Sequence, residues 1–151
     1  MTGAERYFED YRPGDVFEGG GIAVSEDDIL DFARRYDPQD MHVDRRKAGS
    51  GPFGGIIASG WHTTALMMRL VVEHYLSQAS SLASPGIDEL RWLRPVRPGD
   101  VLRVRVTVLE ATLSRSRPDR GSVKSLVEVL NQKNEVVMTL KPISVMRRRP
   151  Q

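Results

Sequence analysis

The sequence contains no cysteine among its 151 residues. Disulfide scaffolds, thiolate metal sites and cysteine nucleophiles are therefore excluded. Histidine occurs only three times, and the formal net charge is only +2. A charge this small does not predict the basic surface of a nucleic-acid-binding domain, so we expect no nucleic-acid partner.

Long uninterrupted apolar runs are also missing. Residues 1–15 lack the basic stretch and apolar run of a secretory signal. The most apolar segment, residues 56–76, is interrupted by His62, Arg69 and Glu73, which argues against a membrane span. We therefore expect no membrane association and a cytoplasmic protein. A chain of this length buries one sizeable core, which predicts a single domain over residues 1–151.

Two segments have helical periodicity. Ser25 and Asp28 resemble a capping pair and precede an apolar stripe, which predicts a helix over residues 26–35. Residues 56–76 predict a longer, buried helix. Its broad apolar face comprises Ile57, Trp61, Ala65, Met68, Val72 and Tyr75.

Most of the remaining chain has strand patterns. Residues 101–113 alternate apolar with polar side chains, and residues 131–134 form a turn signal before another such segment. This order of elements indicates an α+β fold class in which an antiparallel β-sheet wraps around a long central α-helix. Strands are expected over residues 16–24, 87–96, 101–113, 122–130 and 135–146.

The segment of residues 36–44 has the composition of a chemical site. Asp37 and His42 lie five positions apart, and Pro38 prevents a regular helix between them. A turn here would let the carboxylate and the imidazole face the same small volume. Two groups that exchange protons near neutral pH are what hydration, dehydration or hydrolysis requires.

Other motifs are excluded by their context. Residues 49–54 match the letters of the dinucleotide-binding G-x-G-x-x-G pattern, but no buried strand precedes them. Ser59 lacks the flanking glycines of a G-x-S-x-G nucleophile elbow. The carboxylates around His42 have no second histidine on a rigid element, so we expect no metal and no cofactor.

Several stretches resemble one known family. Residues 36–42, Tyr-Asp-Pro-Gln-Asp-Met-His, match the spacing of the motif Gly-Asp-x-Asn-Pro-x-His, and residues 53–60 are similar to the entry into that family's central helix. Residues 93–96 with 98–100, and residues 11–15, also resemble its signatures. The family is the MaoC-like, or (R)-specific enoyl-CoA hydratase, branch of the hotdog fold.

The resemblance implies a reaction and a catalytic pair. Asp37 and His42 would hold one water, which adds to C3 of a trans-2-enoyl thioester while a proton reaches C2 on the same face. The reverse reaction dehydrates a 3-hydroxyacyl-CoA. Backbone amides of Gly55 and Ile56, expected at the positive end of the buried helix, would stabilise the thioester oxygen. Ser59 resembles the family serine that braces the active-site loop.

Two departures from the family motif matter. Gln39 replaces an asparagine and Asp40 replaces a proline. The carboxylate of Asp40 is expected to raise the proton affinity of His42. Gln39, Phe53 and His62 are further candidates for the pocket, although His62 is also explained as a core histidine with its hydrogen bonds satisfied.

Two arginine-rich segments are candidates for contacts to the phosphates of CoA or, alternatively, are solvated surface. One contains Arg115, Arg117 and Arg120, and the other is residues 147–149. Trp61 and Trp92 are expected in core or dimer packing, with the wall of an acyl tunnel as the lesser alternative. A sheet that covers one side of its helix also predicts a homodimer or a larger homo-oligomer.

The leading hypothesis is therefore an (R)-specific enoyl-CoA hydratase or 3-hydroxyacyl-CoA dehydratase with an acyl-CoA substrate. An acyl-CoA thioesterase is a second enzyme hypothesis. A non-catalytic acyl-CoA-binding subunit is an alternative of another class, because Gln39 and Asp40 alter the motif.

Overall fold

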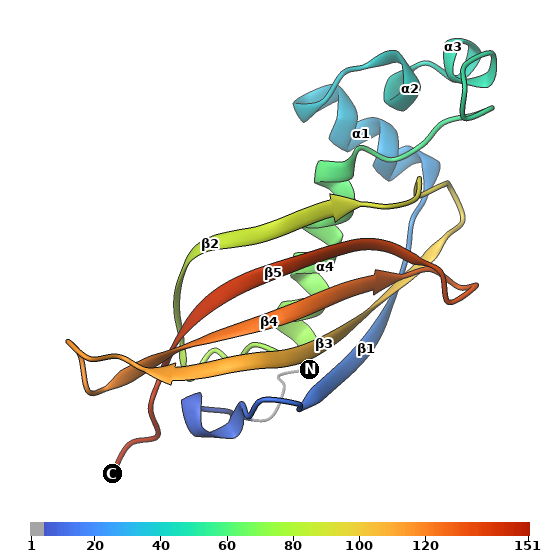
Figure 1. The fold of residues 1–151 in the computed structure, drawn as a ribbon. Coiled ribbons are helices and arrows are strands. Elements are labelled where there is room, and N and C mark those ends of the chain that lie inside the picture. The colour runs from blue at the N-terminus through green and yellow to red at the C-terminus, as the bar shows by residue number, and fades with distance from the viewer. Residues whose placement is uncertain (1–4) are drawn as a thin grey trace.

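A five-stranded antiparallel sheet curves around one long helix in the computed structural model, which describes residues 5–151 (Figure 1). The predicted α+β architecture is confirmed. The strands are β1 (Val16–Ala23), β2 (Ser81–Trp92), β3 (Val101–Leu113), β4 (Arg120–Leu130) and β5 (Val136–Arg147). The helices are the 3-10 turn η1 (Phe8–Asp10), then α1 (Glu26–Tyr36), α2 (Asp40–Val43), α3 (Arg45–Gly49) and α4 (Gly60–His74).

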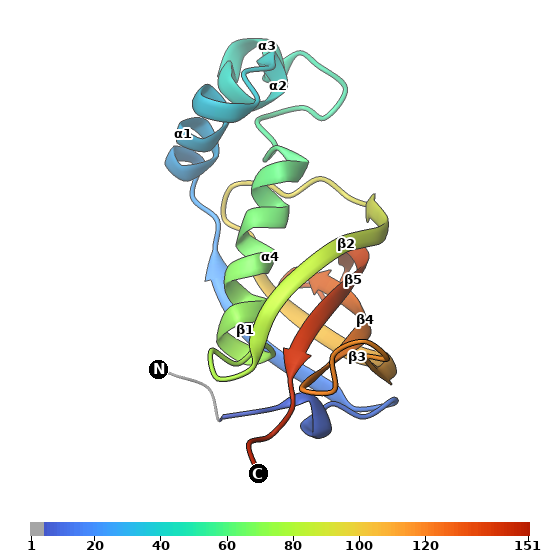
Figure 2. The ribbon, with the colours of Figure 1, turned by 90° about the vertical axis from the view of Figure 1, so that its left-hand side faces the viewer.

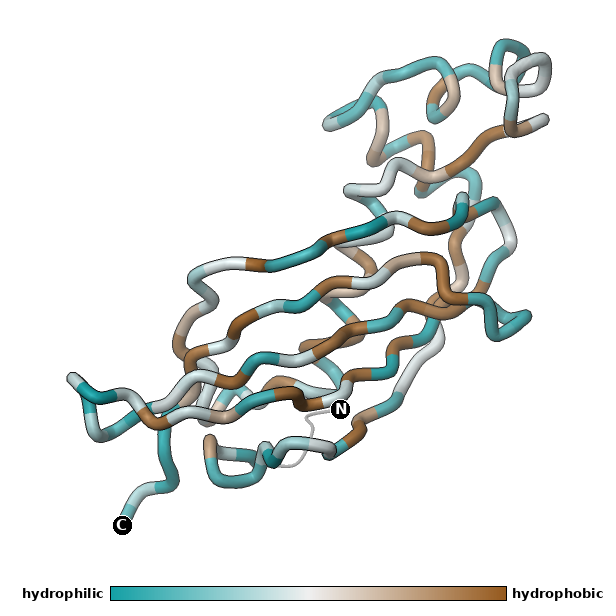
Figure 3. The backbone as a smooth tube through the Cα atoms, in the orientation of Figure 1, coloured by the Kyte–Doolittle hydropathy of each residue, from teal (hydrophilic) through white to brown (hydrophobic). Residues whose placement is uncertain are grey.

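The sheet has the strand order β1-β3-β4-β5-β2, and every neighbouring pair is antiparallel. Apolar and polar residues alternate along the strands (Figure 3), and the buried set faces α4. Val104 pairs with Val129 and Val106 with Val127, and all four side chains are fully buried. Burial of each such side chain contributes roughly 1.5–3 kcal/mol to folding. The sheet is therefore the rigid base on which the other elements are placed.

Helices α1, α2 and α3 form a cluster beyond one end of the sheet, next to the N-terminus of α4 (Figures 1 and 2). Helix α1 matches its predicted range closely. The Ser25 hydroxyl caps it by accepting a hydrogen bond from the Asp28 N–H at 3.1 Å. Acidic residues in its first turn and arginines in its last turn complement the helix dipole. Helix α1 ends at Tyr36, one residue before Asp37.

Helix α4 begins later than predicted. Residues 56–59 are not helical, because their backbone groups bond to α2 and to the loop after β2 instead of to the next helical turn. The Ile57 N–H donates to the Met41 carbonyl at 3.2 Å, and the Ala58 N–H donates to the Val96 carbonyl at 2.8 Å. Ser59 then caps the helix. Residues 56–58 are apolar because they are buried between α2 and the loop after β2, and they do not form a helical turn.

The expected buried face of α4 is also wrong in part. The sheet covers the side that includes Met67, Leu70 and Val71. The predicted face is largely exposed, with Trp61 58% and Met68 47% exposed. Figure 2 shows the sheet on only one side of α4. The helix therefore has a second apolar face that this chain does not cover.

Strand β2 is displaced from its predicted range of residues 87–96. Its first half contains Pro85, and β2 is at the edge of the sheet, where a residue without an N–H is tolerated. Residues 93–96 leave the strand and form a loop. The shift matters for function because this loop lines a cavity, described below.

Strand β1 confirms the strand expected over residues 16–24. Gly19 is required where β1 crosses the end of α4, since an added Cβ there would overlap the ring of His74. His74 is the last residue of α4, and its side chain is 34% exposed. None of the helices within residues 5–151 is long and apolar enough to cross a membrane.

Candidate active site

Asp37 and His42 converge as the sequence predicts. Asp37 follows the last residue of α1, Pro38 interrupts the helix, and His42 lies in the short helix α2. The carboxylate Oδ2 of Asp37 is 3.4 Å from Nε2 of His42. Their side chains are only 16% and 5% exposed. A carboxylate and an imidazole therefore face one another in a site with little access to bulk water.

The orientation of the His42 ring is fixed from behind. Its Nδ1 lies 2.7 Å from the carbonyl oxygen of Ile57. A carbonyl can only accept a hydrogen bond, so Nδ1 carries the proton and donates it. In the neutral ring, Nε2 then presents a lone pair toward Asp37. The extended segment before α4 thus sets the tautomer of the catalytic candidate.

Two neutral side chains hold the Asp37 carboxylate. Ser59 Oγ donates to Oδ2 at 2.7 Å, and Gln39 Nε2 donates to Oδ1 at 2.7 Å. Burial raises the pKa of Asp37, but these two hydrogen bonds and the nearby His42 outweigh it and lower the pKa below the ordinary value of 3.8. Asp37 is therefore ionised at neutral pH.

Ser59 connects this pair to α4. Besides its bond to Asp37, its hydroxyl accepts from the Trp61 N–H at 3.2 Å and so caps the helix. Ser59 is fully buried. The contact between Ser59 and the active-site loop, expected from the family resemblance, is present.

Asp40 does not contact His42. Its carboxylate faces Lys47 Nζ at 3.5 Å, and its side chain is 63% exposed. The expected effect of Asp40 on the proton affinity of His42 therefore has no structural basis. In contrast, Gln39 bonds to Asp37 directly, so it takes part in the site although it departs from the family motif.

A cavity of about 380 Å³ opens beside His42. Its wall is mostly apolar, and Phe53 contributes to it as predicted. Gly60 also lines it, and an added Cβ there would lie 2.5 Å from atoms of the Trp92 ring, so only glycine fits at this close approach. The remaining lining residues are Met41, Ile57, Ala58, Thr63, Leu93, Arg94, Pro95, Val96 and Val137.

His62 is not among the residues that line this cavity. Its ring stacks on Phe32 of α1 at a centroid distance of 4.8 Å. Burial lowers its pKa, although the carboxylate of Asp28 opposes this shift. Within residues 5–151, its Nδ1 has no hydrogen-bond partner. His62 is therefore a core histidine. Its Nδ1 lacks the hydrogen bond that the sequence interpretation included.

Gly55 and Ile56 precede the helix start by several residues, so their amides are not at the positive end of α4. The amide at that position belongs to Gly60, which lines the cavity and has no acceptor within the described residues. The sequence missed Gly60 because the apolar residues before it extend the helical pattern. The capping serine was the one available signal.

The tryptophans are less buried than core packing requires. Trp61 and Trp92 contact each other edge to face at 5.1 Å. Trp92 is 44% exposed and forms part of the cavity wall. Its Nε1 donates to Thr64 Oγ1 at 3.2 Å.

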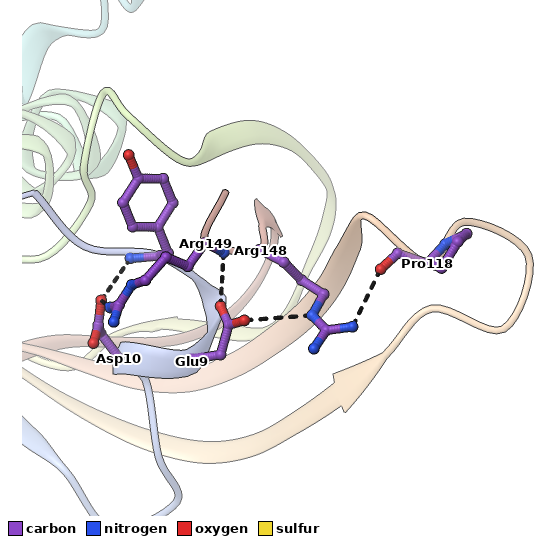
Figure 4. A network of polar contacts seen from close by, with 6 residues as sticks. Glu9, Asp10, Pro118, Arg148 and Arg149 are labelled. Carbon is purple, nitrogen blue, oxygen red and sulfur yellow. Dashed lines mark hydrogen bonds and ion pairs between the residues drawn. The ribbon is translucent and has the colours of Figure 1, made fainter. Parts of the chain in front are cut away.

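The predicted arginine contacts lie at the other end of the sheet from Asp37 (Figure 1). The loop with Arg115, Arg117 and Arg120 joins β3 to β4 beside η1 and the C-terminus. Figure 4 shows that Arg148 and Arg149 are paired with the acidic residues Glu9 and Asp10, and Arg120 pairs with Asp119. Within one chain, none of these arginines faces the cavity.

No group of three or more histidine or acidic side chains is arranged to hold a metal ion in the part of the chain that the structure describes. The candidate site thus consists of Asp37, His42, their supporting residues and the adjoining apolar cavity. Such a site offers proton transfer next to an apolar ligand.

Comparison with known proteins identifies the family. Residues 10–131 match the family model described as MaoC like domain. The chain therefore belongs to the MaoC-like family. Its fold is the hotdog fold, as the sequence resemblance predicted.

Three relatives illustrate the match. The structure of a MaoC-like dehydratase from Rhodospirillum rubrum has a TM-score of 0.90 and 42% identity, and the match covers 97% of this chain and 100% of that one. The uncharacterized protein YdeM of Bacillus subtilis is 37% identical over 125 residues, which are 83% of this chain and 87% of that protein. The 3-hydroxyacyl-thioester dehydratase Z of Mycobacterium tuberculosis is 32% identical, over 72% and 80% of the two chains.

Proposed function

We propose that this protein is an (R)-specific enoyl-CoA hydratase and 3-hydroxyacyl-CoA dehydratase that uses Asp37 and His42. The observation that carries the proposal is the 3.4 Å approach of Asp37 Oδ2 to His42 Nε2 with both groups nearly buried. Similarity to a thioester dehydratase supports the reaction class. The family membership and the site geometry thus point to the same chemistry.

His42 is the base on the water in this proposal. Its Nε2 is the free nitrogen, because Nδ1 donates to Ile57. As Nε2 accepts a proton from water, the water oxygen bonds to C3 and the C2–C3 double bond shifts its electrons to the thioester oxygen. The imidazolium then supplies a proton to C2 on the same face, which completes the addition of one water.

Asp37 remains ionised throughout. Its lowered pKa makes the carboxylate a weak base at neutral pH. An anion beside the ring stabilises the imidazolium that forms when His42 takes the proton. The carboxylate also accepts a hydrogen bond from the attacking water and so orients it. Gln39 and Ser59 hold the carboxylate in the required position.

The thioester oxygen becomes negative during the addition and needs a donor. We assign this role to the Gly60 N–H, because Gly60 lines the cavity and is the first residue of α4. Loss of one such donor typically costs about 3 kcal/mol of transition-state stabilisation. Gly60 replaces Gly55 and Ile56 in the mechanism expected from the sequence.

The function is tested with crotonyl-CoA as substrate. Hydration removes the absorbance of the conjugated thioester without release of thiol, and chromatography on a chiral phase identifies 3-(R)-hydroxybutyryl-CoA. Release of free thiol would instead indicate a thioesterase. Absence of both reactions across acyl chain lengths, with CoA still bound, would indicate a non-catalytic subunit. The bond from Gln39 to Asp37 favours the enzyme over the subunit, because the altered motif still holds the carboxylate.

We further propose that the exposed face of α4 is covered by a second copy of the chain. Trp61 and Met68 are its most exposed apolar members, and this surface is continuous with the half-exposed Trp92 in the cavity wall. The mass in solution tests it: Met68→Asp should convert a dimer to monomers. Leu109→Asp, at a similarly exposed apolar position on β3, is the matched control and should not. A monomeric wild type would contradict this.

The single domain and cytoplasmic location remain predictions.

A further inference from the structure

A second cavity adjoins the catalytic one. It measures about 190 Å³ and is polar, whereas the first cavity is mostly apolar. The two cavities share Arg94 and Pro95 as lining residues. The other residues around it are Arg97, Asp100, Asn131, Gln132, Lys133 and Glu135. A ligand could therefore extend from His42 past Arg94 into a polar environment.

Hydrogen bonds hold the second cavity in shape. It lies between two turns, one before β3 and the other between β4 and β5. Gln132 joins them, because its Nε2 donates to Asp100 Oδ1 at 2.9 Å and its Oε1 accepts from the Val101 N–H at 3.0 Å. Asn131 Oδ1 accepts from the N–H groups of Lys133 and Glu135, which closes the second turn. The two turns that carry the lining residues are therefore held in place before any ligand binds.

The charges of this cavity favour an anion. Both carboxylates are already engaged: Asp100 accepts from Gln132 and from the Arg97 N–H, and Glu135 binds Arg94 and Asn131. Within residues 5–151, the side chains of Arg97 and Lys133 have neither an ion-pair nor a hydrogen-bond partner. These two exposed cations, next to Arg94, can bind a phosphate without breaking an existing ion pair.

We propose that this second cavity binds phosphate groups of the CoA portion of the substrate, through Arg97 and Lys133. The proposal rests on the proposed function, since it takes the acyl thioester to lie beside His42. It also replaces the assignment of phosphate contacts to Arg115, Arg117 and Arg120, which lie at the other end of the sheet. The CoA portion then extends from the apolar cavity past Arg94 and reaches the side chains of Arg97 and Lys133.

Calorimetric titration with free CoA tests this proposal without turnover. The double variant Arg97→Ala/Lys133→Ala should bind CoA roughly 10- to 100-fold more weakly than the wild type, since hydrogen bonds to charged groups are among the stronger ones. Arg12→Ala/Lys141→Ala removes the same charges elsewhere and should bind CoA as the wild type does. Pantetheine, which lacks the phosphates, should bind all three proteins equally.

Kinetics on crotonyl-CoA provide a second readout. The Arg97→Ala/Lys133→Ala variant should lose activity through a higher KM, because the phosphates bind equally in ground and transition states. Unchanged CoA affinity in this variant would overturn the proposal. So would a loss of CoA affinity in Arg115→Ala/Arg117→Ala alone, which would move the phosphate site to the β3–β4 loop. If hydration is absent but the double variant still loses CoA affinity, the cavity assignment stands and only the catalytic proposal fails.

Discussion

The two ends of the sheet differ in how they use charge. At the site end, formed by α1–α3 and residues 56–60, Asp37 and His42 are nearly buried, and neutral groups from Ser59, Gln39 and Ile57 hold them. At the far end, formed by η1, the β3–β4 loop and residues 147–149, arginines pair with carboxylates in exposed positions (Figure 4).

This difference is the reason for assigning the proposed function to Asp37 and His42 and not to the arginines at the far end. An exposed ion pair is screened by solvent and contributes about 0–1 kcal/mol. A nearly buried carboxylate with neutral donors keeps its charge and has no cation to cancel it. Its field therefore acts on the adjacent imidazole. The number of charged residues in a segment is therefore a weaker indicator of a functional site than the kind of partner that each charged side chain has.

The largest effect is expected from removing the catalytic pair. Asp37→Asn and His42→Ala should each lower kcat for hydration by about 10²–10⁴-fold, the range typical of general acid–base catalysis. Steady-state kinetics and circular dichroism of the folded variants check this. Glu9→Gln, at the far end, is the control and should retain wild-type kcat. If kcat fell by a similar factor in all three variants, the two ends of the sheet would not differ in their importance for hydration.

A smaller effect separates the two roles of Ser59. Ser59→Ala removes a helix cap and a donor to Asp37, whereas Ser25→Ala removes only the cap of α1. Both changes should lower the free energy of unfolding by about 0.5–2 kcal/mol. Only Ser59→Ala should also raise the pKa of Asp37 and reduce kcat. Equal kcat in the two variants would show that the serine acts through the helix alone.

Gln39→Leu tests the neutral support of Asp37 more finely. Without the Gln39 donor, the pKa of Asp37 should rise toward 3.8. The carbon NMR chemical shift of its side-chain carboxyl group, followed as a function of pH, measures this pKa. A folded-state pKa below the unfolded value stabilises the fold above about pH 4. That contribution is lost as pH falls through the folded pKa. The variant should therefore be less stable than the wild type at neutral pH, and the gap should narrow in acid. A pKa unchanged by the substitution would exclude Gln39 as a support.

The smallest effect is expected at the far end. Glu9→Gln breaks the exposed contacts to Arg148 and Arg149. Its cost in unfolding free energy should be below about 1 kcal/mol and should shrink further in high salt. Denaturant titration at two salt concentrations measures it. A cost that is larger and independent of salt would mean that the far end also contains a buried charged network.

The proximity of Asp37 and His42 could be predicted from the sequence for a physical reason. Asp37 and His42 are close in the chain, and Pro38 forces the turn that brings them together. Ser59 could be placed only through the family resemblance, because its bond to Asp37 joins distant segments. The α+β order of elements was also readable, since strand and helix periods differ clearly.

Other features depended on tertiary contacts that the sequence does not encode locally. The start of α4 at Gly60 was missed because residues 56–58, buried between α2 and the loop after β2, have the same apolar composition as a buried helix. The exposed face of α4 was predicted to be buried because its residues are apolar. Apolar composition alone does not show whether the same chain covers such a face. The cations Arg97 and Lys133 were overlooked because they meet only where two separate turns are joined by Gln132.

The most direct test of the account is hydration of crotonyl-CoA in D₂O, with the product analysed by proton NMR. We expect one deuterium at C2 on the same face as the new 3-hydroxyl group, because one site between Asp37 and His42 delivers both the water oxygen and the proton. In Asp37→Asn the rate of incorporation should fall by about 10²–10⁴-fold, as kcat does. Deuterium on the opposite face, or incorporation at the wild-type rate in Asp37→Asn, would contradict the proposed mechanism.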